Sequence, residues 1–399
     1  MLFFKKKKAE PKKPLGLYVH IPFCIKKCNY CDFLSAPADD TTKKRYVDAL
    51  CKEIAGYKKL TKEYQVATVY FGGGTPSILP VSLIEQILSV IQKSFNITME
   101  TAEITLEVNP GTVTADKLKQ YRELGINRLS IGVQSAKEKE LALLGRIHSF
   151  EDAKNTVQWA RKAGFNNISL DLISALPGQS LTDYKENVEA VLSLNPEHIS
   201  SYSLIVEEGT AFYEQYAEGA PRERELPDEE TDRAMYAYTK ERLAQAGYER
   251  YEISNYAKPG FESRHNSSYW TGTEYLGAGL GASSLFTNAR YHNETDLLTY
   301  MEEIEAGRDV RREIERLVES EQMEEFMILG LRRMCGVSRE EFRKRFGRPL
   351  ETVYGSALQK LKKQELITME GDRVALTETG IDVSNQVFVE FIPEDFVRR

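Results

Sequence analysis

The sequence lacks any long apolar run and any excess of positive charge. No segment approaches the roughly 18 consecutive apolar residues that a membrane-spanning helix needs, and Met1-Leu-Phe-Phe is too short for the apolar region of a signal peptide. Its 53 Lys and Arg stand against 60 Asp and Glu, which gives a net charge of -7. Without a global positive field, nucleic acid is not expected as the main partner. We expect a cytoplasmic chain that touches membranes at most peripherally, through a basic flexible tail at residues 1–14.

Cysteine is also scarce, but its distribution is uneven. Three of the five cysteines, Cys24, Cys28 and Cys31, lie within eight residues. In a cytosolic chain this crowding indicates a metal or cluster site rather than disulfides. Three thiolates on one loop suit a [4Fe-4S] cluster that keeps one iron open for a small molecule, whereas a structural zinc site takes four ligands. Zinc is the alternative, with His20 as the nearby candidate for a fourth ligand.

Residues 15–205 alternate short β-rich segments with amphipathic ones, which predicts an α/β fold with parallel strands and crossover helices, a partial (β/α)6 barrel. Helix start signals occur at Thr42, Pro80, Thr114 and Ser180. In such folds ligands bind at the carboxyl ends of the strands. The six expected strands are Leu15 to Ile21, Ala67 to Phe71, Glu103 to Val108, Arg128 to Gly132, Asn167 to Ile173 and His198 to Leu204.

Two further segments follow the expected barrel. Residues 206–310 contain a predicted long helix, Asp228 to Ala246, and are interpreted as an elaboration that closes the barrel. Residues 311–399 contain three helical segments and two short apolar strands, which predicts a winged-helix-like α+β domain. Because Arg308 to Arg348 carries nine acidic against eleven basic residues, no clean basic face for DNA is present, and we expect a docking or lid role.

Several motifs together resemble the radical S-adenosylmethionine (SAM) superfamily and, within it, the oxygen-independent coproporphyrinogen III oxidase group. The likeness covers about residues 15–392 and begins with Cys-x3-Cys-x2-Cys, with Tyr30 before the last cysteine. The motifs are Tyr18-Val-His-Ile-Pro-Phe-Cys24, Gly72-Gly-Gly-Thr-Pro76, Glu107-Val-Asn-Pro110, Ile131-Gly-Val-Gln-Ser135, Leu144-Gly-Arg-Ile-His148, Asp171-Leu-Ile-Ser-Ala-Leu-Pro-Gly-Gln179 and Leu376-Thr-Glu-Thr-Gly380.

The resemblance implies a [4Fe-4S] cluster on the three cysteines and SAM on its open iron. The chemical character of the matched residues agrees with this, because Arg146 offers a planar fork for a carboxylate, while Glu107 and Asp171 can accept hydrogen bonds from the ammonium group or the ribose hydroxyls. The positions that match SAM contacts of the family are Tyr18, Tyr30, Gly73, Gly74, Thr75, Glu107, Gln134, Arg146, Asp171 and Ser203.

Three features place the chain near the HemW-like heme chaperone branch rather than the oxidases. Phe33 stands where the oxidases carry a further cysteine, and only 17 residues precede Tyr18. The segment from His265 to Trp270 is similar to the His-Asn-x-x-Tyr-Trp signature of the branch. The resemblance implies that His265 ligates heme iron, while Tyr269 and Trp270 pack on the macrocycle. For His265 a hydrogen-bonded loop histidine is the alternative.

The leading hypothesis is therefore a chaperone that binds heme and passes it to acceptor proteins, membrane respiratory proteins among them, with a homodimer as one option. The first alternative is an oxidase that decarboxylates the propionate side chains of coproporphyrinogen III. An RNA-modifying radical SAM protein that uses the C-terminal domain is a third hypothesis. The resemblance leaves open whether the chain turns over a substrate, and no catalytic residue is assigned.

Overall fold

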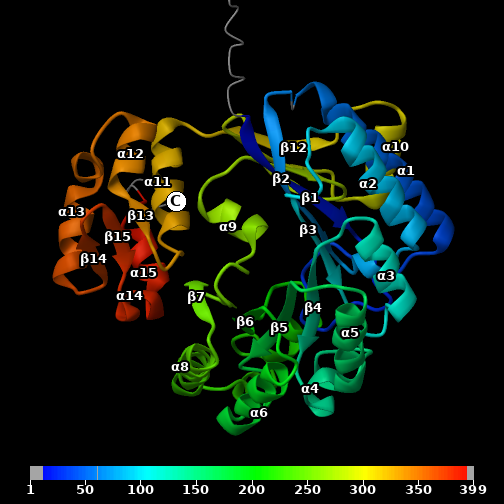
Figure 1. Cartoon of the computed structure of the whole chain (residues 1–399). Coiled ribbons are helices and arrows are strands. Elements are labelled where there is room, and N and C mark those ends of the chain that lie inside the picture. The colour runs from blue at the N-terminus through cyan, green and yellow to red at the C-terminus, as the bar shows by residue number, and fades with distance from the viewer. Residues whose placement is uncertain (1–11, 61, 393–399) are drawn as a thin grey trace, which may run out of the picture.

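The computed structural model describes residues 12–60 and 62–392, so most of the predicted basic tail lies outside the described residues. Its main feature is a 12-stranded sheet with the order β12-β11-β10-β9-β1-β2-β3-β4-β5-β6-β8-β7. Figure 1 shows this curved sheet beside a smaller C-terminal unit. Within the described ranges, no helix has both the length and the apolar character required to cross a bilayer.

The six predicted strands are all present and pair in parallel in the order of the sequence. This confirms the α/β class with a partial barrel of six parallel strands. Because the strands run in one direction, their carboxyl ends meet along one edge of the sheet. The strands are β1 (Lys13–Ile21), β2 (Tyr64–Gly73), β3 (Glu103–Val108), β4 (Arg128–Gln134), β5 (Ile168–Ser174) and β6 (His198–Ser203).

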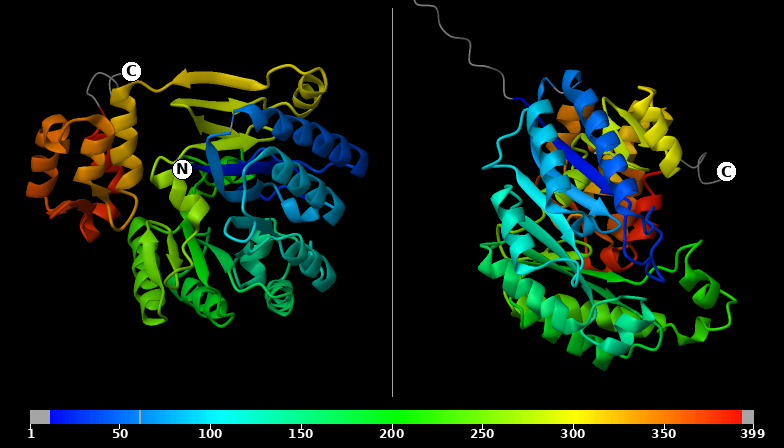
Figure 2. Two further views of the ribbon diagram at one scale, coloured as in Figure 1. Left: turned by 45° about the horizontal axis from the view of Figure 1, so that its top comes forward. Right: turned by 90° about the vertical axis from the view of Figure 1, so that its right-hand side faces the viewer.

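Six helices connect these strands and cover the outer face of the sheet (Figure 2). Thr114 and Ser180 cap their helices as predicted, each accepting a hydrogen bond from a backbone N–H three residues later. The prediction at Thr42 was wrong, because Asp39 is the cap and the amide of Thr42 donates to it. The helices are α1 (Asp40–Gly56), α2 (Val81–Ser94), α3 (Ala115–Glu123), α4 (Glu138–Leu143), α5 (Phe150–Lys162) and α6 (Leu181–Leu192).

The segment after β6 extends the sheet at both edges. Two strands join the β6 edge and four join the β1 edge, where β9 runs parallel to β1. The predicted long helix is confirmed as α8, and α9 lies between the sheet and the C-terminal unit, where it contacts β2 and α11 (Figure 1). These elements are α7 (Ala211–Tyr216), α8 (Glu229–Gln245), β7 (Glu249–Glu252), β8 (Asn255–Ala257), α9 (Arg264–Trp270), β9 (Tyr275–Ala278), β10 (Ser283–Phe286), β11 (Ala289–Asn293), α10 (Leu297–Glu305) and β12 (Arg311–Arg316).

The C-terminal unit has an apolar core of its own, built from side chains between Met323 and Phe391. Its three-stranded sheet has the order β13-β15-β14, so one strand more than predicted is present. Because β12 pairs with β11 in the large sheet, we propose that the second unit begins after Arg316. Its elements are α11 (Glu319–Gly330), β13 (Val337–Ser338), α12 (Arg339–Phe346), α13 (Leu350–Lys363), β14 (Ile367–Glu370), β15 (Arg373–Leu376), α14 (Glu378–Asp382) and α15 (Ser384–Val389).

A buried carboxylate ties α1 to the elements at the β1 edge of the sheet. Glu53 accepts hydrogen bonds from the hydroxyl of Tyr300 at 2.5 Å, from Nδ2 of Asn293 at 2.7 Å and from the backbone amide of Gly279 at 2.9 Å. These donors belong to α10, to β11 and to the loop after β9. The same loop is connected to β1 by Tyr46, whose hydroxyl donates to the carbonyl of His20 at 2.7 Å and accepts from the amide of Leu280. Glu53 therefore supports the end of β1, where the cysteine loop begins.

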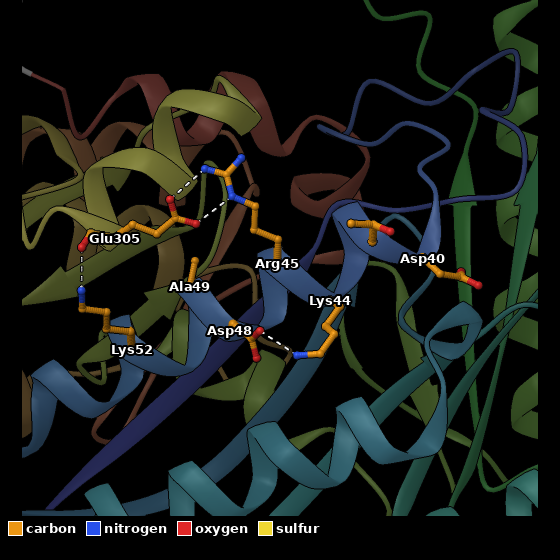
Figure 3. Close-up of a pocket in the computed structure, with 8 residues that line it drawn as sticks. Asp40, Lys44, Arg45, Asp48, Ala49, Lys52 and Glu305 are labelled. Carbon is orange, nitrogen blue, oxygen red and sulfur yellow. Dashed lines mark hydrogen bonds and ion pairs between the residues drawn. The ribbon is translucent and has the colours of Figure 1, made fainter.

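On the outer surface, α1 and α10 are joined by exposed charges (Figure 3). The Arg45 guanidinium donates to both carboxylate oxygens of Glu305, each at 2.7 Å, and Lys52 donates to the carbonyl of Glu305. Lys44 pairs with Asp48 at 2.9 Å. These groups line a hollow of about 620 Å³. Because none of the predicted site residues lies in this hollow, we interpret it as a helix-to-helix contact surface.

Replacing Glu53 by Ala leaves at least the Tyr300 hydroxyl and the Gly279 amide buried without this acceptor. A buried donor left unsatisfied costs about 1–3 kcal/mol. We expect Glu53→Ala to lower the free energy of unfolding by about 2 kcal/mol or more, measured by chemical denaturation. Lys44→Ala is the matched control, because an exposed ion pair contributes at most about 1 kcal/mol. Equal denaturation curves for the two variants would contradict this account of Glu53.

Candidate functional site

A cavity of about 440 Å³ lies at the carboxyl ends of the parallel strands. This volume is within the range of about 300–1,000 Å³ that is typical of ligand pockets. All three crowded cysteines line it, together with nine of the predicted SAM contacts. The predicted residues at this cavity are Cys24, Cys28, Tyr30, Cys31, Gly73, Gly74, Thr75, Glu107, Gln134, Arg146, Asp171 and Ser203.

The cysteine loop between β1 and α1 is held in place by backbone hydrogen bonds. The amide of Cys24 donates to the carbonyl of Ala36 at 3.2 Å, which closes the base of the loop. At its middle, Asn29 donates from its backbone amide to the carbonyl of Leu144 at 3.0 Å and from Nδ2 to the carbonyl of Leu143 at 2.9 Å. The loop is thus attached both to its own base and to the end of α4. All three cysteines are free thiols, and burial raises the pKa of Cys24 and Cys31.

The glycines that follow β2 allow the cysteine loop to approach this strand closely. A Cβ at Gly74 would lie 2.6 Å from the carbonyl oxygen of Phe23 and 2.9 Å from Cβ of Ser35. A Cβ at Gly73, where φ is +113°, would lie 2.6 Å from the His20 ring. The amides of Gly74 and Thr75 donate to backbone carbonyls of this region, Thr75 to Phe23 at 2.7 Å. Only glycine fits at these two positions, because any side chain would push the loop away from the strand.

Arg146 connects the cysteine loop with the ends of β3 and β4. Its Nη2 donates to Oδ1 of Asn109 at 2.6 Å and to the carbonyl of Gly132 at 2.8 Å, while Nη1 points at Sγ of Cys28, 3.6 Å away. Asn109 in turn donates from Nδ2 to Oγ1 of Thr75 at 2.7 Å. The guanidinium therefore stands beside the Cys28 thiol and links the cysteine loop to the ends of two strands.

Two half-buried carboxylates, Glu107 and Asp171, line the cavity from β3 and β5. Burial, reinforced by the charge of Asp171, raises the pKa of Glu107 to about 7, although the Tyr70 hydroxyl donates to it at 2.9 Å. Burial also raises the pKa of Asp171, against the opposing effect of its serine hydrogen bonds and of the Arg128 charge. Ser130 donates to Asp171 at 3.1 Å. A cationic ligand group would offset the desolvation of these carboxylates, as the predicted contact with SAM requires.

The local backbone aims Gln134 toward the cavity. Its φ is +66°, in the left-handed region that residues other than glycine rarely adopt, and a register shift between β4 and β5 occurs at the same place. Ser203, at the end of β6, also lines the cavity, and its hydroxyl donates to Asp232 of α8 at 2.8 Å. Both predicted contacts thus line the cavity through features that only the folded chain displays.

Tyr18 and His265 are the two predicted site residues that do not line this cavity. The Tyr18 hydroxyl shares a hydrogen bond of 3.0 Å with Nδ1 of His20. His265 is 1% exposed, and both of its ring nitrogens have partners, Oγ1 of Thr68 and the hydroxyl of Tyr269, each at 2.8 Å. Burial lowers the pKa of His265 to about 3. Ligation of heme iron by His265 stays a prediction, and it requires that one of these two hydrogen bonds breaks.

Several cavity residues were not predicted from the sequence. Asn109 belongs to the quoted Glu-Val-Asn-Pro motif, so the sequence held a signal for it. Arg128 had a weaker signal, the single charged side chain of a strand that is buried along most of its length. Phe33, Tyr202 and Ile205 form an apolar rim at the cavity, and they are 60%, 42% and 67% exposed. Exposure of large apolar side chains beside a cavity is a property of the tertiary structure and marks a binding surface.

The residues present fit a cluster better than a closed zinc site. In the described part of the chain, no group of three His, Cys, Asp or Glu side chains is arranged to hold a single metal ion. The nitrogens of His20 contact Tyr18 and the carbonyl of Leu34, so this histidine is not a fourth ligand beside the cysteines. Three thiols on one loop facing a shared cavity are the donor set that leaves one iron open.

Gly74→Ala is expected to weaken retention of the cluster, because its new Cβ would displace Phe23 and Ser35 and with them the base of the cysteine loop. We expect the iron and sulfide content per reconstituted chain to fall by more than half, together with the visible absorbance. Gly355→Ala is the control, since nothing lies within 4 Å of a Cβ at this helical position and alanine there stabilises by about 0.5–1 kcal/mol. A full complement of iron in the Gly74 variant would show that the cluster does not depend on the close approach of the cysteine loop to β2.

The comparisons with known proteins agree with this geometry. Residues 18–191 match the Radical SAM superfamily and residues 317–383 match the HemN C-terminal domain. The radical SAM domain assigns a [4Fe-4S] cluster and SAM to the chain as cofactors. In fold, the chain is similar to the coproporphyrinogen III oxidase HemN of Escherichia coli, a radical SAM enzyme, with a TM-score of 0.84 at 24% identity over 95% of this chain and 90% of that one.

Curated relatives cover nearly the whole chain. The heme chaperone HemW of Lactococcus lactis is 36% identical over 96% of this chain and 98% of its own length. The heme chaperone HemW of Bacillus subtilis is 37% identical over 94% of this chain and 99% of its own length. The chain therefore belongs to the family of the heme chaperone HemW proteins, which is built on the radical SAM domain.

Proposed function

We propose that this protein binds heme at the cavity beside the cysteine loop and transfers it to acceptor proteins. Relatives that share its full length are heme chaperones, and this likeness supports the same role here. The proposal includes a cytoplasmic location, membrane respiratory proteins among the acceptors and a homodimer as the assembled form. No catalytic residue is needed for such a transfer, because heme keeps its covalent structure.

The apolar rim of Phe33, Tyr202 and Ile205 is the observation that carries this proposal. Heme presents a large flat apolar face and two carboxylates, so its site must combine exposed apolar side chains with buried polar ones. The rim offers the former and the cavity behind it offers the latter. Phe33 also separates this chain from the oxygen-independent coproporphyrinogen III oxidases, which carry a cysteine at this position. The rim thus supplies an apolar contact at a position that the oxidases use differently.

SAM and the cluster would share the cavity, with the cysteines as cluster ligands. When bound, these cofactors would supply one-electron chemistry, and the protein would hold and orient them. Arg146 is placed to receive the carboxylate of SAM, since it lines the cavity beside Cys28. Glu107 is placed to accept from the ammonium group. We propose that in this protein the cofactors organise the cavity for heme.

Charged substitutions in the rim are expected to weaken heme binding. Wild-type protein with its cluster should bind about one equivalent of heme in an anaerobic titration. Phe33→Asp or Ile205→Asp places a carboxylate against an apolar face, and burial of such an unpaired polar group costs about 1–3 kcal/mol, so we expect the dissociation constant to rise roughly 10-fold to 100-fold. The absorbance change of the heme Soret band measures it.

Leu298→Asp is the control for these variants, because Leu298 is equally exposed but lies on α10, away from the cavity. His265→Ala separates the two contributions to heme binding: loss of the axial-ligand spectrum with retained rim dependence supports ligation by His265. Unchanged affinity in both rim variants would overturn the rim as the heme surface. Formation of protoporphyrinogen from coproporphyrinogen III, with SAM and a strong reductant, would favour the oxidase alternative.

The affinity for SAM is expected to depend on pH through Glu107. Because burial raises its pKa to about 7, this carboxyl is protonated below neutral pH and then cannot accept from the SAM ammonium group. We expect SAM binding to strengthen as pH rises through about 7, with a slope that approaches about tenfold per pH unit well below that value. Calorimetry of SAM binding measures this dependence. Glu107→Gln should remove it, and an equally steep profile in that variant would show that another group titrates.

A further inference from the structure

Arg128 is a buried cation with unused hydrogen-bond donors. Its side chain is 1% exposed and yet lines the cavity. Nε is buried without a partner, and within the described residues the guanidinium forms neither a hydrogen bond nor an ion pair. An arginine carries five N–H donors in a fixed fork, and buried charges are normally paired. This arrangement indicates that the guanidinium binds a hydrogen-bond acceptor of a ligand.

The polar neighbours of Arg128 are bonded to one another rather than to it. His198 shares hydrogen bonds with Ser169 at 2.7 Å and with Tyr251 at 2.8 Å, and both ring nitrogens of His265 are also occupied. Burial and the charge of Arg128 lower the pKa of both histidines, which keeps them neutral. Asp171 interacts with Arg128 through space, but its carboxylate accepts from serines instead. Asp171 therefore offsets part of the positive charge of Arg128, whereas the N–H donors of Arg128 have no acceptor among the described residues.

Arg128 also lies at the opposite end of the cavity from the cluster site. Alternate residues of β4 face the cavity, namely Arg128, Ser130, Gly132 and Gln134. Arg128 is the first residue of this strand and Gln134 the last. At about 3.3 Å per residue the two ends are roughly 20 Å apart. Arg128 therefore lies at the inner end of the cavity, where its charge also acts on Asp171.

We propose that Arg128 is the carboxylate anchor of the cavity and binds a propionate of heme, whose macrocycle extends from there toward the apolar rim. This inference rests on the proposed function and assigns a site for the charged end of the ligand. The fork of a guanidinium matches a carboxylate with two parallel hydrogen bonds. Asn266, the neighbour of His265 in the His-Asn-x-x-Tyr-Trp signature, lines the same cavity and can supply an amide donor to the same ligand. Through Asn266, this signature contributes a side chain to the cavity.

The test compares heme with heme dimethyl ester, which has the same macrocycle but no carboxylates. Both are titrated anaerobically into wild-type protein and into Arg128→Met and Arg128→Lys. We expect Arg128→Met to weaken heme binding roughly 10-fold to 100-fold and to leave the affinity for the ester unchanged. Arg128→Lys keeps the charge but loses the fork, so we expect an intermediate loss.

Arg250→Met is the matched control for the loss of a buried arginine. Arg250 has an 8% exposed side chain that pairs with Glu378 and donates to the Tyr236 hydroxyl, away from the cavity. We expect this variant to lower the thermal midpoint without a change in heme affinity, and Arg128→Met to lower the midpoint less. Equal weakening for heme and its ester, or unchanged heme affinity in Arg128→Met, would overturn the anchor alone. A wild-type protein that binds no heme would overturn the proposed function together with the anchor.

Discussion

The site depends on the close approach between the cysteine loop and the end of β2. Backbone amides of Gly74 and Thr75 donate to carbonyls of the chain around the first cysteine, and there is no space for a Cβ at Gly73 or Gly74. This contact fixes the three thiols above the carboxyl ends of the parallel strands. Tyr46 donates to the carbonyl of His20 near the end of β1, and Glu53 holds the adjoining loop after β9. The loop is therefore positioned by the protein's own hydrogen bonds.

The cavity below this loop has a gradient of polarity that suits two different ligands. Arg146 stands at the cluster end and the carboxylates of Glu107 and Asp171 follow along the strands, a combination that matches a zwitterionic molecule such as SAM. The rim is apolar, and the inner end holds Arg128 with unused donors. Removing these charged groups from water costs free energy. We therefore expect each of them to pair with a complementary group of a bound ligand. A carboxylate-bearing, otherwise apolar ring compound satisfies the rim and the inner end together.

Much of the barrel was predictable because its signals are local in the sequence. The six strands were predicted within a few residues of their observed bounds, since β-rich segments between amphipathic ones show directly in the chain. The helix α5 was missed although Ser149 and Asp152 form a capping box that the sequence displays. The start of α1 was misplaced, because Asp39 and Thr42 are both good caps and only the backbone conformation decides between them. The strand β13 is two residues long and leaves no pattern to detect.

By itself, the sequence determined the fold class and the cysteine trio, because spacing and residue type suffice for these, while the cofactors followed from its resemblance to the radical SAM superfamily. It did not determine which side chains share a surface. His265 belongs to a motif that suggested heme ligation, yet in the fold its ring is buried and hydrogen-bonded, and its neighbour Asn266 faces the cavity instead. Arg128 and the rim of Phe33, Tyr202 and Ile205 became visible only through their burial and exposure. These properties arise from contacts between strands far apart in the chain, which no local pattern of residues encodes.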